Sequence, residues 1–538
     1  MQKHKTLAIK KYVFPSLLVL AVIFARLLPG LRPIDDAFIT YRYARNILSG
    51  NGFAFNPGVH IQGTTTPFYT LLLTLLGLFA RRETASFPEI ALLVNVFADS
   101  LTALIIWEIG KKLNSATTGT AAALFWAIAP YSVTFSIGGL ETSLYILLLT
   151  ASVYFYIQKK TRLAAFSSSL GVVTRPDGIL LSILLIVHLI WTLLKDNQNP
   201  SQSKWDRFKT IIPEIILFSF PLLLWFGFAW IYFGNPIPHS ILAKSQAYFL
   251  PQKSAFIRFL QHFATPFMDQ HTFGTYWVGV SLVLYPFLFI IGARKGLSNT
   301  SRLWPWILYP WLYFSIFSLA NPLIFRWYLT PPLLPYIFFI FTGIEDIIRS
   351  ILSKLQHVPY LSALAADQNV ITNLVIILPL ILTSQAWTLK PDHGPQRPAP
   401  KMAWFKLELL YREAAQVINE DLQSTKDPTH PKPILAAADV GVLGYYTGLE
   451  ILDLVGLNSR EALDYYPLEK SAYVSNYAVP EDLVLDKKPE YLVILEVYGR
   501  NNLLKNPSFL NQYKLMHKIE TDIYGSQGML AYKRSSNE

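Results

Sequence analysis

Apolar segments recur along the first 390 residues, and they constrain the fold more than any other feature of this chain. The first covers residues 12–30, and the others lie near 89–110, 118–137, 142–158, 162–175, 178–194, 211–233, 273–292, 303–320, 327–348 and 370–389. The chain is 52% hydrophobic and only 15% charged, whereas soluble domains carry roughly 25% charged residues. Since a helix needs about 20 apolar residues to span a bilayer, we expect a polytopic α-helical membrane protein with about 11 transmembrane helices.

The basic residues predict how this protein is oriented in the membrane. Lys3, Lys5, Lys10 and Lys11 precede the first span, which favours a cytoplasmic N-terminus and a retained anchor, since no small-residue cleavage site follows. The 14-residue segment 67–80 is short for a span, so we expect an interfacial or re-entrant helix. On that topology 18 of the 29 basic residues before residue 390 lie in inner loops. The prediction is a multi-pass plasma-membrane protein with an extracytoplasmic C-terminus.

A proline-rich stretch at 390–400, KPDHGPQRPAP, marks the end of the membrane part. We expect a membrane domain over 1–390, a linker over 391–400 and a soluble α/β domain over 401–538. In the last, 402–423 has the pattern of an amphipathic helix, and ILAAADVGVLGYY, YLVILEV and GMLAYKR have that of short buried strands.

Charge and cysteine content exclude several classes of function. The net charge of +11 divides into about −3 for residues 390–538 and +14 for the rest, where the positive residues lie in short loops between apolar spans. That excess indicates topology, and we expect no nucleic-acid partner. The chain has no cysteine, so neither disulfides nor thiol chemistry are expected.

Two adjacent carboxylates, Asp35 and Asp36, follow the first span in the predicted external loop 31–88. A charge beside lipid must be solvated, paired or functional. One function that suits this place is that of a general base, which takes a proton from a hydroxyl group while the other substrate sits in the bilayer. Alternatively, Asp35 only caps the helix that begins after Pro33. Neighbours in a helix diverge by about 100°, so at most one of the two should face a given oxygen.

A sugar carried on a polyprenyl phosphate is a substrate that fits this layout, and its departing phosphate would need cations. Lys244 and His239, in the predicted external loop 234–272, and Arg326, close to Tyr328, are the candidates for donor or substrate binding. Snorkelling to lipid headgroups is the alternative for Arg326, and ordinary hydrogen bonding is the alternative for His239.

Further charged residues stand at the outer ends of predicted spans. Glu141, Arg175 and Asp177 are site candidates for that reason, although a Glu–Arg clamp between helix ends explains them equally well. Arg42 follows Asp35 in the same predicted helix, where neutralising the carboxylate pair is a simpler role than binding phosphate.

Motifs for metals and nucleotides are missing from the sequence. No HxxxH, CxxC, Walker-type or GxGxxG pattern occurs, so no cofactor is predicted. Gly441, Gly444 and Gly448, in DVGVLGYYTG, are expected to be turn glycines and not a phosphate cradle.

Several segments, taken in order, resemble one known family. DDAFITYRYARN, GNGFAFNPG and QGTTTP resemble the first external loop of the GT-C glycosyltransferases, in particular the arabinofuranosyltransferase-like branch, which is related to lipid A aminoarabinose transferase and protein mannosyltransferases. The later segments GLET, RPDG, FGNPIPHSILAKS, RWYLTPP and DVGVLGYYTGLEILDLVGLN resemble it in the same order.

The resemblance implies an inverting enzyme of the cell envelope that transfers a hexose or pentose from a polyprenyl-phosphate donor to a glycan or lipid-linked acceptor. It places the general base at Asp35 or Asp36 and the donor phosphate near Lys244 and Arg326. GT-C enzymes differ in metal use, and because the sequence contains no complete metal site we expect metal independence.

Two other classes of function stay open. A transporter or flippase of lipid-linked sugars would usually contain repeated halves, and the sequence has no internal repeat. A non-catalytic glycan-binding membrane scaffold would use the soluble domain but leave Asp35 and Asp36 unexplained.

Overall fold

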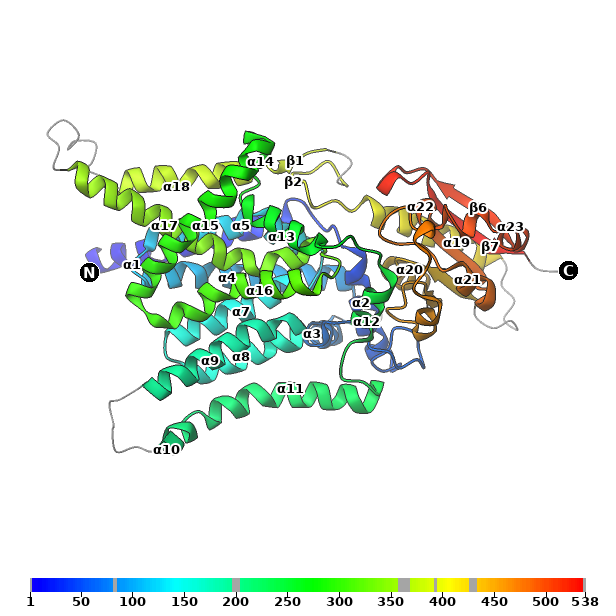
Figure 1. The fold of residues 1–538 in the computed structure, drawn as a ribbon, viewed down its shortest axis with the longest axis horizontal. Helices are drawn as coiled ribbons and strands as arrows, with labels where there is room; N and C mark the ends of the chain where they lie inside the picture. The colour runs from blue at the N-terminus through cyan, green and yellow to red at the C-terminus, as the bar shows by residue number, and fades with distance from the viewer. Residues whose placement is uncertain are drawn as a thin grey trace.

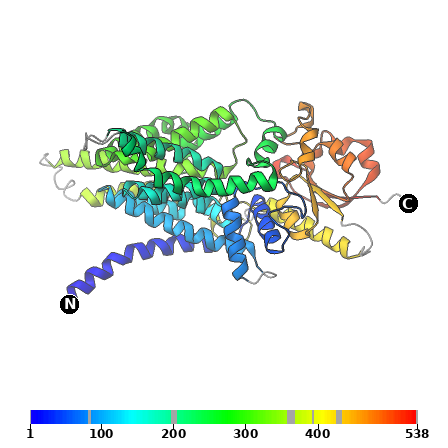
Figure 2. The same cartoon turned by 90° about the horizontal axis from the view of Figure 1, so that it is seen from below.

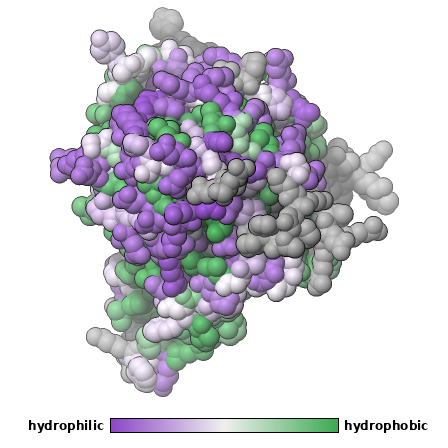
Figure 3. All heavy atoms as spheres, turned by 90° about the vertical axis from the view of Figure 1, so that its right-hand side faces the viewer, coloured by the Kyte–Doolittle hydropathy of each residue, from purple (hydrophilic) through white to green (hydrophobic). Residues whose placement is uncertain are grey.

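A bundle of helices forms most of the molecule, and a small sheet domain covers one end of it (Figures 1 and 2). The computed structural model describes residues 2–80, 85–195, 204–356, 368–390, 394–424 and 433–535. The N-terminus lies at the end of the bundle away from the sheet domain, and the C-terminus lies beyond the sheet domain. Hydrophilic side chains predominate on the face that the sheet domain presents (Figure 3).

The N-terminal part is helical apart from one short pair of strands. Its elements are α1 (Gln2–Leu27), α2 (Asp35–Leu48), α3 (Pro67–Phe79), α4 (Phe87–Lys112), α5 (Ala116–Ile128), α6 (Pro130–Ile137), α7 (Thr142–Ile157), α8 (Thr161–Thr174), α9 (Ile179–Lys195), α10 (Lys204–Lys209), α11 (Ile212–Phe233), α12 (His239–Ala247), α13 (Ser254–Ala264), α14 (Gln270–Phe273), α15 (Thr275–Asn299), α16 (Trp304–Ala320), α17 (Thr330–Leu355) and α18 (Gln368–Ser384), followed by β1 (Trp387–Thr388) and β2 (Ala399–Pro400). β2 lies within the predicted linker and pairs with β1 in antiparallel fashion.

Five of the described helices are long and apolar enough to cross a bilayer. They are Phe87–Lys112, Pro176–Lys195, Ile212–Phe233, Thr275–Asn299 and Arg326–Leu355, and α5 with α6 makes a sixth if the pair, bent by 42°, is one span. The bend falls at Pro130, whose ring cannot fit within a continuous helix. α11 shows the lipid-facing character most clearly, because apolar side chains such as Leu223 and Ile231 are 71% and 88% exposed. A multi-pass membrane protein is confirmed, and the number 11 stays a prediction.

Segment 67–80 forms the 13-residue helix α3. At 1.5 Å per residue it is about 20 Å long, which is shorter than the roughly 30 Å hydrocarbon core of a bilayer. It packs against α2, α4 and α8.

A buried ion pair lies inside the bundle, and the sequence did not single it out. The Nε of Arg26 lies 2.7 Å from Oδ2 of Asp99, and both side chains are fully buried. Trp126 and Ser143 also donate to Asp99, so each charge is compensated locally, as low-dielectric surroundings require.

The C-terminal domain is a mixed sheet of five strands in the order β4-β3-β5-β7-β6. β3 is parallel to β4 and β5, and β7 is antiparallel to β5 and β6. The elements are α19 (Lys406–Ser424), β3 (Ile434–Ala437), α20 (Gly441–Thr447), β4 (Glu450–Asp453), α21 (Glu481–Lys487), β5 (Tyr491–Leu495), α22 (Glu496–Gly499), α23 (Pro507–Gln512), β6 (Tyr513–Ile519) and β7 (Met529–Arg534). The expected α/β fold is confirmed.

Three predictions within this domain hold and one is wrong in part. The helix predicted over 402–423 is α19, and YLVILEV and GMLAYKR contain β5 and β7. The run ILAAADVGVLGYY is not one strand, because β3 ends at Ala437 and the second half forms α20. Apolar content cannot separate a buried strand from a buried helix over so short a stretch. β4 and β6 were not predicted.

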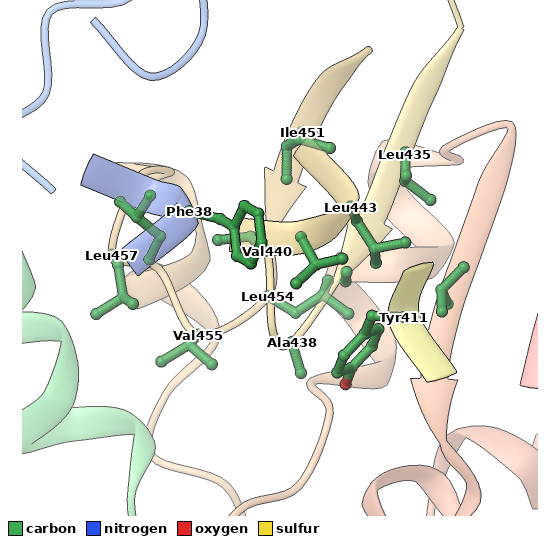
Figure 4. Close-up of a cluster of buried hydrophobic side chains, with 14 of the residues drawn as sticks. Phe38, Tyr411, Leu435, Ala438, Val440, Leu443, Ile451, Leu454, Val455 and Leu457 are labelled. Atoms are coloured by element: carbon green, nitrogen blue, oxygen red, sulfur yellow. The ribbon is translucent and has the colours of Figure 1, made fainter. Parts of the chain in front are cut away.

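Helix α2 joins the two parts of the molecule. Phe38, on α2, is 4% exposed and packs into the apolar cluster of the C-terminal domain beside Val440 and Leu443 (Figure 4). The sheet domain therefore packs against α2, which lies in the predicted external loop 31–88.

Candidate functional site

Asp35 is bonded to the C-terminal domain. Its two carboxylate oxygens accept backbone hydrogen bonds from Gly441 (3.0 Å) and Val442 (2.7 Å), 406 and 407 residues away in the chain. These are first-turn N–H groups of α20, which have no acceptor within their own helix. Burial and the neighbouring Asp439 carboxyl raise the pKa of Asp35 well above its ordinary value. Asp35 is thus used as an interdomain contact.

Arg42 makes the corresponding contact two turns further along α2. Its guanidinium donates to the carbonyls of Gly444 (2.5 Å) and Leu449 (2.6 Å), and also to Phe55 and Asn56 of the segment that was predicted to be an external loop. Residues seven apart share a helix face. From this face of α2, the Asp35 carboxylate contacts the beginning of α20 and the Arg42 guanidinium contacts carbonyl groups toward its end. Carbonyl oxygens, and not Asp35, are its hydrogen-bond partners.

The glycines of DVGVLGYYTG explain why α20 can lie so close to α2. A Cβ on Gly441 would collide with the backbone of Asp35, and one on Gly444 would collide with the side chain of Arg42. Only Gly448, with φ +67°, has the conformation of a turn glycine. The prediction of three turn glycines is therefore correct for Gly448 and wrong for the other two.

Asp36, the neighbour of Asp35, has a different partner and forms an ion pair with Lys244 of α12. Asp36 Oδ2 lies 3.7 Å from Lys244 Nζ, and the two side chains are 35% and 25% exposed. Burial disfavours the charged ammonium, but the Asp36 carboxylate outweighs this effect, and the pKa of Lys244 is raised. The pair thus consists of an accessible carboxylate and a firmly protonated lysine.

Aromatic rings surround this ion pair on the side of the short 3-10 turn Arg326–Leu329. Lys244 Nζ lies 4.7 Å from the ring centroid of Phe325, which stacks on Trp327 at 4.7 Å. Arg326, on the same turn, is exposed, and its guanidinium donates one hydrogen bond among the described residues, to the carbonyl of Met402 (3.3 Å). Its other donors remain available to an anion.

The acidic and basic candidates at the ends of α7 and α8 form one cluster. Arg175 donates to Glu141 (3.2 Å) and to both oxygens of Asp177 (3.0 and 3.3 Å), and Tyr328 lies under its guanidinium at 4.9 Å. These contacts form the Glu–Arg clamp between helix ends, which was one of the two interpretations that the sequence left open. Because its donors are engaged by two carboxylates, Arg175 is poorly placed to hold a phosphate as well.

His239 is a predicted site residue that lies at a separate cavity. It begins α12, five residues before Lys244, and its side chain lines a separate cavity of about 290 Å³ with Gln62 and Arg460. The structure thus gathers Asp36, Lys244, Tyr328, Glu141 and Arg175 in one region and places His239 beside it.

Two acidic residues of the C-terminal domain belong to this region and were not predicted. Asp439 follows β3 and accepts a hydrogen bond from Tyr411 (2.6 Å), and burial raises its pKa. Glu408, in the first turn of α19, is also affected electrostatically by Asp36 and Asp439. A signal for Asp439 was present, because polar residues at the carboxyl ends of parallel strands are frequent site residues.

The protonation of Glu408 predicts how domain contact depends on pH. Burial raises the pKa of Glu408 to about 8, above its ordinary value of about 4.3. A raised carboxyl pKa stabilises the docked state fully below the ordinary pKa, and this stabilisation is lost as the pH rises through about 8. Protection of the α19 and α20 amides against hydrogen exchange, measured relative to their intrinsic exchange rates at each pH, should therefore decrease as the pH rises from about 5 to 8.

Glu408→Gln, which mimics the protonated form, should reduce this loss of protection between about pH 5 and 8. If wild type and Glu408→Gln show the same profile in this window, Glu408 is not the group responsible. Asp35 and Asp439, whose pKa values are also raised by burial, are then the remaining candidates. Asp439→Asn tests the second of them.

Two family models match parts of the chain. The model described as the GPI transamidase subunit PIG-U matches residues 61–239, and a domain of unknown function, DUF8728, matches residues 405–534. No curated protein matches the sequence.

Solved structures are similar over almost the whole chain. The oligosaccharyltransferase of Archaeoglobus fulgidus, in complex with zinc and sulfate, has a TM-score of 0.54 and 11% identity, and the match covers 97% of this chain and 73% of that one. ArnT from Cupriavidus metallidurans is similar with undecaprenyl phosphate bound (TM-score 0.53) and in the apo state (0.55), each at 9% identity over 98% of both chains. These structures are GT-C glycosyltransferases, and the chain has their fold. The predicted GT-C fold is confirmed.

Proposed function

We propose that this protein is a membrane glycosyltransferase that moves a monosaccharide from a polyprenyl-phosphate donor to a glycan or lipid-linked acceptor, with inversion at the anomeric carbon. The Asp36–Lys244 ion pair, at the junction of the apolar bundle and the hydrophilic domain, is the observation that carries the proposal. The GT-C fold, shared with ArnT bound to undecaprenyl phosphate, supports it.

In the proposed reaction Asp36 is the general base. It accepts the proton of an acceptor hydroxyl while that oxygen attacks the anomeric carbon from the face opposite the phosphate. The new C–O bond forms as the bond to the phosphate oxygen breaks, and the polyprenyl phosphate departs with the electron pair. Lys244, whose Nζ lies 3.7 Å from Asp36 Oδ2, forms an ion pair with this carboxylate.

Cations near the leaving group are the second requirement of this reaction. Arg326 is the best candidate, because it is exposed and retains hydrogen-bond donors beyond the one that Met402 uses. Lys244, whose Nζ lies 4.7 Å from the ring centroid of Phe325, would contribute a second positive charge. We propose Arg175, Glu141 and Asp177 as a positioning cluster that fixes Tyr328 beside the donor.

We further propose that the reaction takes place on the extracytoplasmic face and needs no metal. The orientation follows from the basic residues of the predicted inner loops. Metal independence is supported by Lys244, which supplies a positive charge beside Asp36.

A second candidate is favoured by the match of residues 61–239 to a GPI transamidase subunit. On this alternative the protein would bind a lipid-linked glycan as one component of a larger complex, without turnover of its own.

Reconstitution of the full chain in liposomes distinguishes these functions. With a labelled polyprenyl-phosphate sugar and cell-envelope glycan, we expect transfer of label to the glycan, undiminished by EDTA. Movement of label between leaflets without transfer would favour a flippase, and tight glycan binding without consumption of donor would favour the scaffold. Either result would overturn the proposed activity, and inhibition by EDTA would overturn metal independence alone.

A further inference from the structure

Asp439 is a carboxylate of the C-terminal domain that takes no part in the proposed reaction. It follows β3, whose neighbours β4 and β5 run parallel to it, and it is half-buried. Its Oδ2 accepts a hydrogen bond from Tyr411 (2.6 Å), whereas its Oδ1 accepts none from the described residues and is not fully buried. In the described part of the chain no cation forms an ion pair with it. Because buried polar groups are normally hydrogen-bonded, Oδ1 is left for a donor from outside the protein.

A close backbone contact places Asp439 near Asp36. The nitrogen of Gly441 lies 3.0 Å from Asp35 Oδ2, and a Cβ on Gly441 would collide with the backbone carbonyl of Asp35. The Cα of Asp439, two residues before Gly441, is at most about 7.6 Å from the Cα of that glycine. Asp36 directly follows Asp35. The two carboxylates therefore come from segments that are in contact, one from each domain.

The electrostatics of neighbouring groups agree with this placement. Burial raises the pKa of Asp439, and the Asp36 carboxylate raises it further. The pKa of Tyr248 is raised well above its ordinary value by burial and then by both carboxylates, Asp439 and Asp36. Tyr248 follows Lys244 by four residues at the end of α12, and its ring lies 6.3 Å from that of Phe325. Asp439 thus belongs to the surroundings of the Asp36–Lys244 pair.

The charge of Asp439 indicates what it can bind. Lys244 already pairs with Asp36, so Asp439 adds a negative charge that would repel a phosphate. A hydroxyl group can donate to a carboxylate, and such a bond is about twice as strong as one between neutral groups. Asp439 therefore suits a neutral molecule that carries hydroxyl groups, which places it on the acceptor side of the reaction.

We propose that Asp439 accepts a hydrogen bond from a second hydroxyl of the acceptor, next to the hydroxyl that Asp36 deprotonates. This inference rests on the proposed function and identifies the acceptor as a sugar with adjacent hydroxyls. An acceptor with one isolated hydroxyl, such as a serine side chain, leaves Asp439 without its donor. Asp439 thus selects the acceptor and holds it in the orientation for attack.

Complete and deoxy acceptors test this role in the full chain, reconstituted in liposomes with a labelled polyprenyl-phosphate sugar. The acceptors are octyl glycosides of arabinose, galactose and mannose, and analogues in which hydrogen replaces one ring hydroxyl. Wild type should transfer sugar to at least one complete glycoside, with kcat/KM about tenfold above that of a deoxy analogue that still accepts sugar. Asp439→Ala should lose this preference, because it raises the KM for the complete glycoside and leaves the analogue, which lacks the hydrogen bond already, unaffected.

Asp486→Ala is the matched control. Asp486, on α21, also accepts a hydrogen bond from a tyrosine of its own domain, Tyr465 at 2.9 Å, and its variant should keep the tenfold preference. If Asp439→Ala does not fold, Asp439→Asn keeps an acceptor for Tyr411 and offers an amide nitrogen in place of the second oxygen. It should lose the preference as well.

Several results would overturn the role of Asp439. Equal slowing of complete and deoxy glycosides in the Asp439 variants would assign it a structural role only, and an unchanged preference would assign it none. Wild type that shows no preference, or that transfers sugar to envelope glycan but to none of the glycosides, would contradict acceptor recognition and leave the enzyme function standing. Absence of transfer even to envelope glycan would overturn the enzyme function and this inference with it.

Discussion

Asp36→Asn should lower sugar transfer by 100-fold or more while leaving the fold intact. Removal of a general base typically costs a factor of 10² to 10⁴, and an amide of the same shape cannot accept the proton. The measurement is transfer from a labelled polyprenyl-phosphate sugar to glycan in liposomes, with the rate given per correctly inserted protein.

Asp346→Asn is a matched control for this substitution. Asp346, on α17, also forms an ion pair with a lysine, Lys295 at 3.0 Å, and at 32% its exposure is close to that of Asp36. It lies 16 residues along α17 from Thr330, about 24 Å by helical rise. Transfer by Asp346→Asn should equal that of wild type, and undiminished transfer by Asp36→Asn would exclude Asp36 as the base.

Gly441→Ala should detach α20 from α2. The added Cβ would lie against the backbone of Asp35, where neither side can move without breaking the hydrogen bonds from Gly441 and Val442. Overpacking of this kind costs about 1–3 kcal/mol. Because Asp36 follows Asp35 on the same helix, we expect transfer to fall about tenfold and amide exchange in α20 to accelerate.

Gly448→Ala is the control for Gly441→Ala. It perturbs α20 without adding an atom at the contact with α2. A Cβ at Gly448 meets no atom within 4 Å, but its φ of +67° disfavours alanine. This control should therefore fray the end of α20 and leave the hydrogen bonds of Asp35 in place. Equal loss of transfer in both variants would contradict the role of the α2–α20 contact.

The predicted site shows where sequence reasoning reached its limit. Asp35 and Asp36 were equivalent in the sequence, and the structure gives them different partners, α20 and Lys244. Arg42 was expected near the acids of its own helix, yet it binds carbonyls more than 400 residues away. These partners depend on how the C-terminal domain docks, which no local pattern encodes.

The sequence by itself determined the helical membrane bundle and the α/β domain after it, and it predicts an external place for the carboxylate pair. Those features follow from local properties, namely runs of apolar residues, alternation within strands and the distribution of lysine and arginine. Only the tertiary structure decided that Asp35 holds the two domains together, that Asp36 faces Lys244, and that His239 joins Gln62 and Arg460 around a cavity. Each of these depends on contacts between segments far apart in the chain, and such contacts form only when the sheet domain packs onto α2.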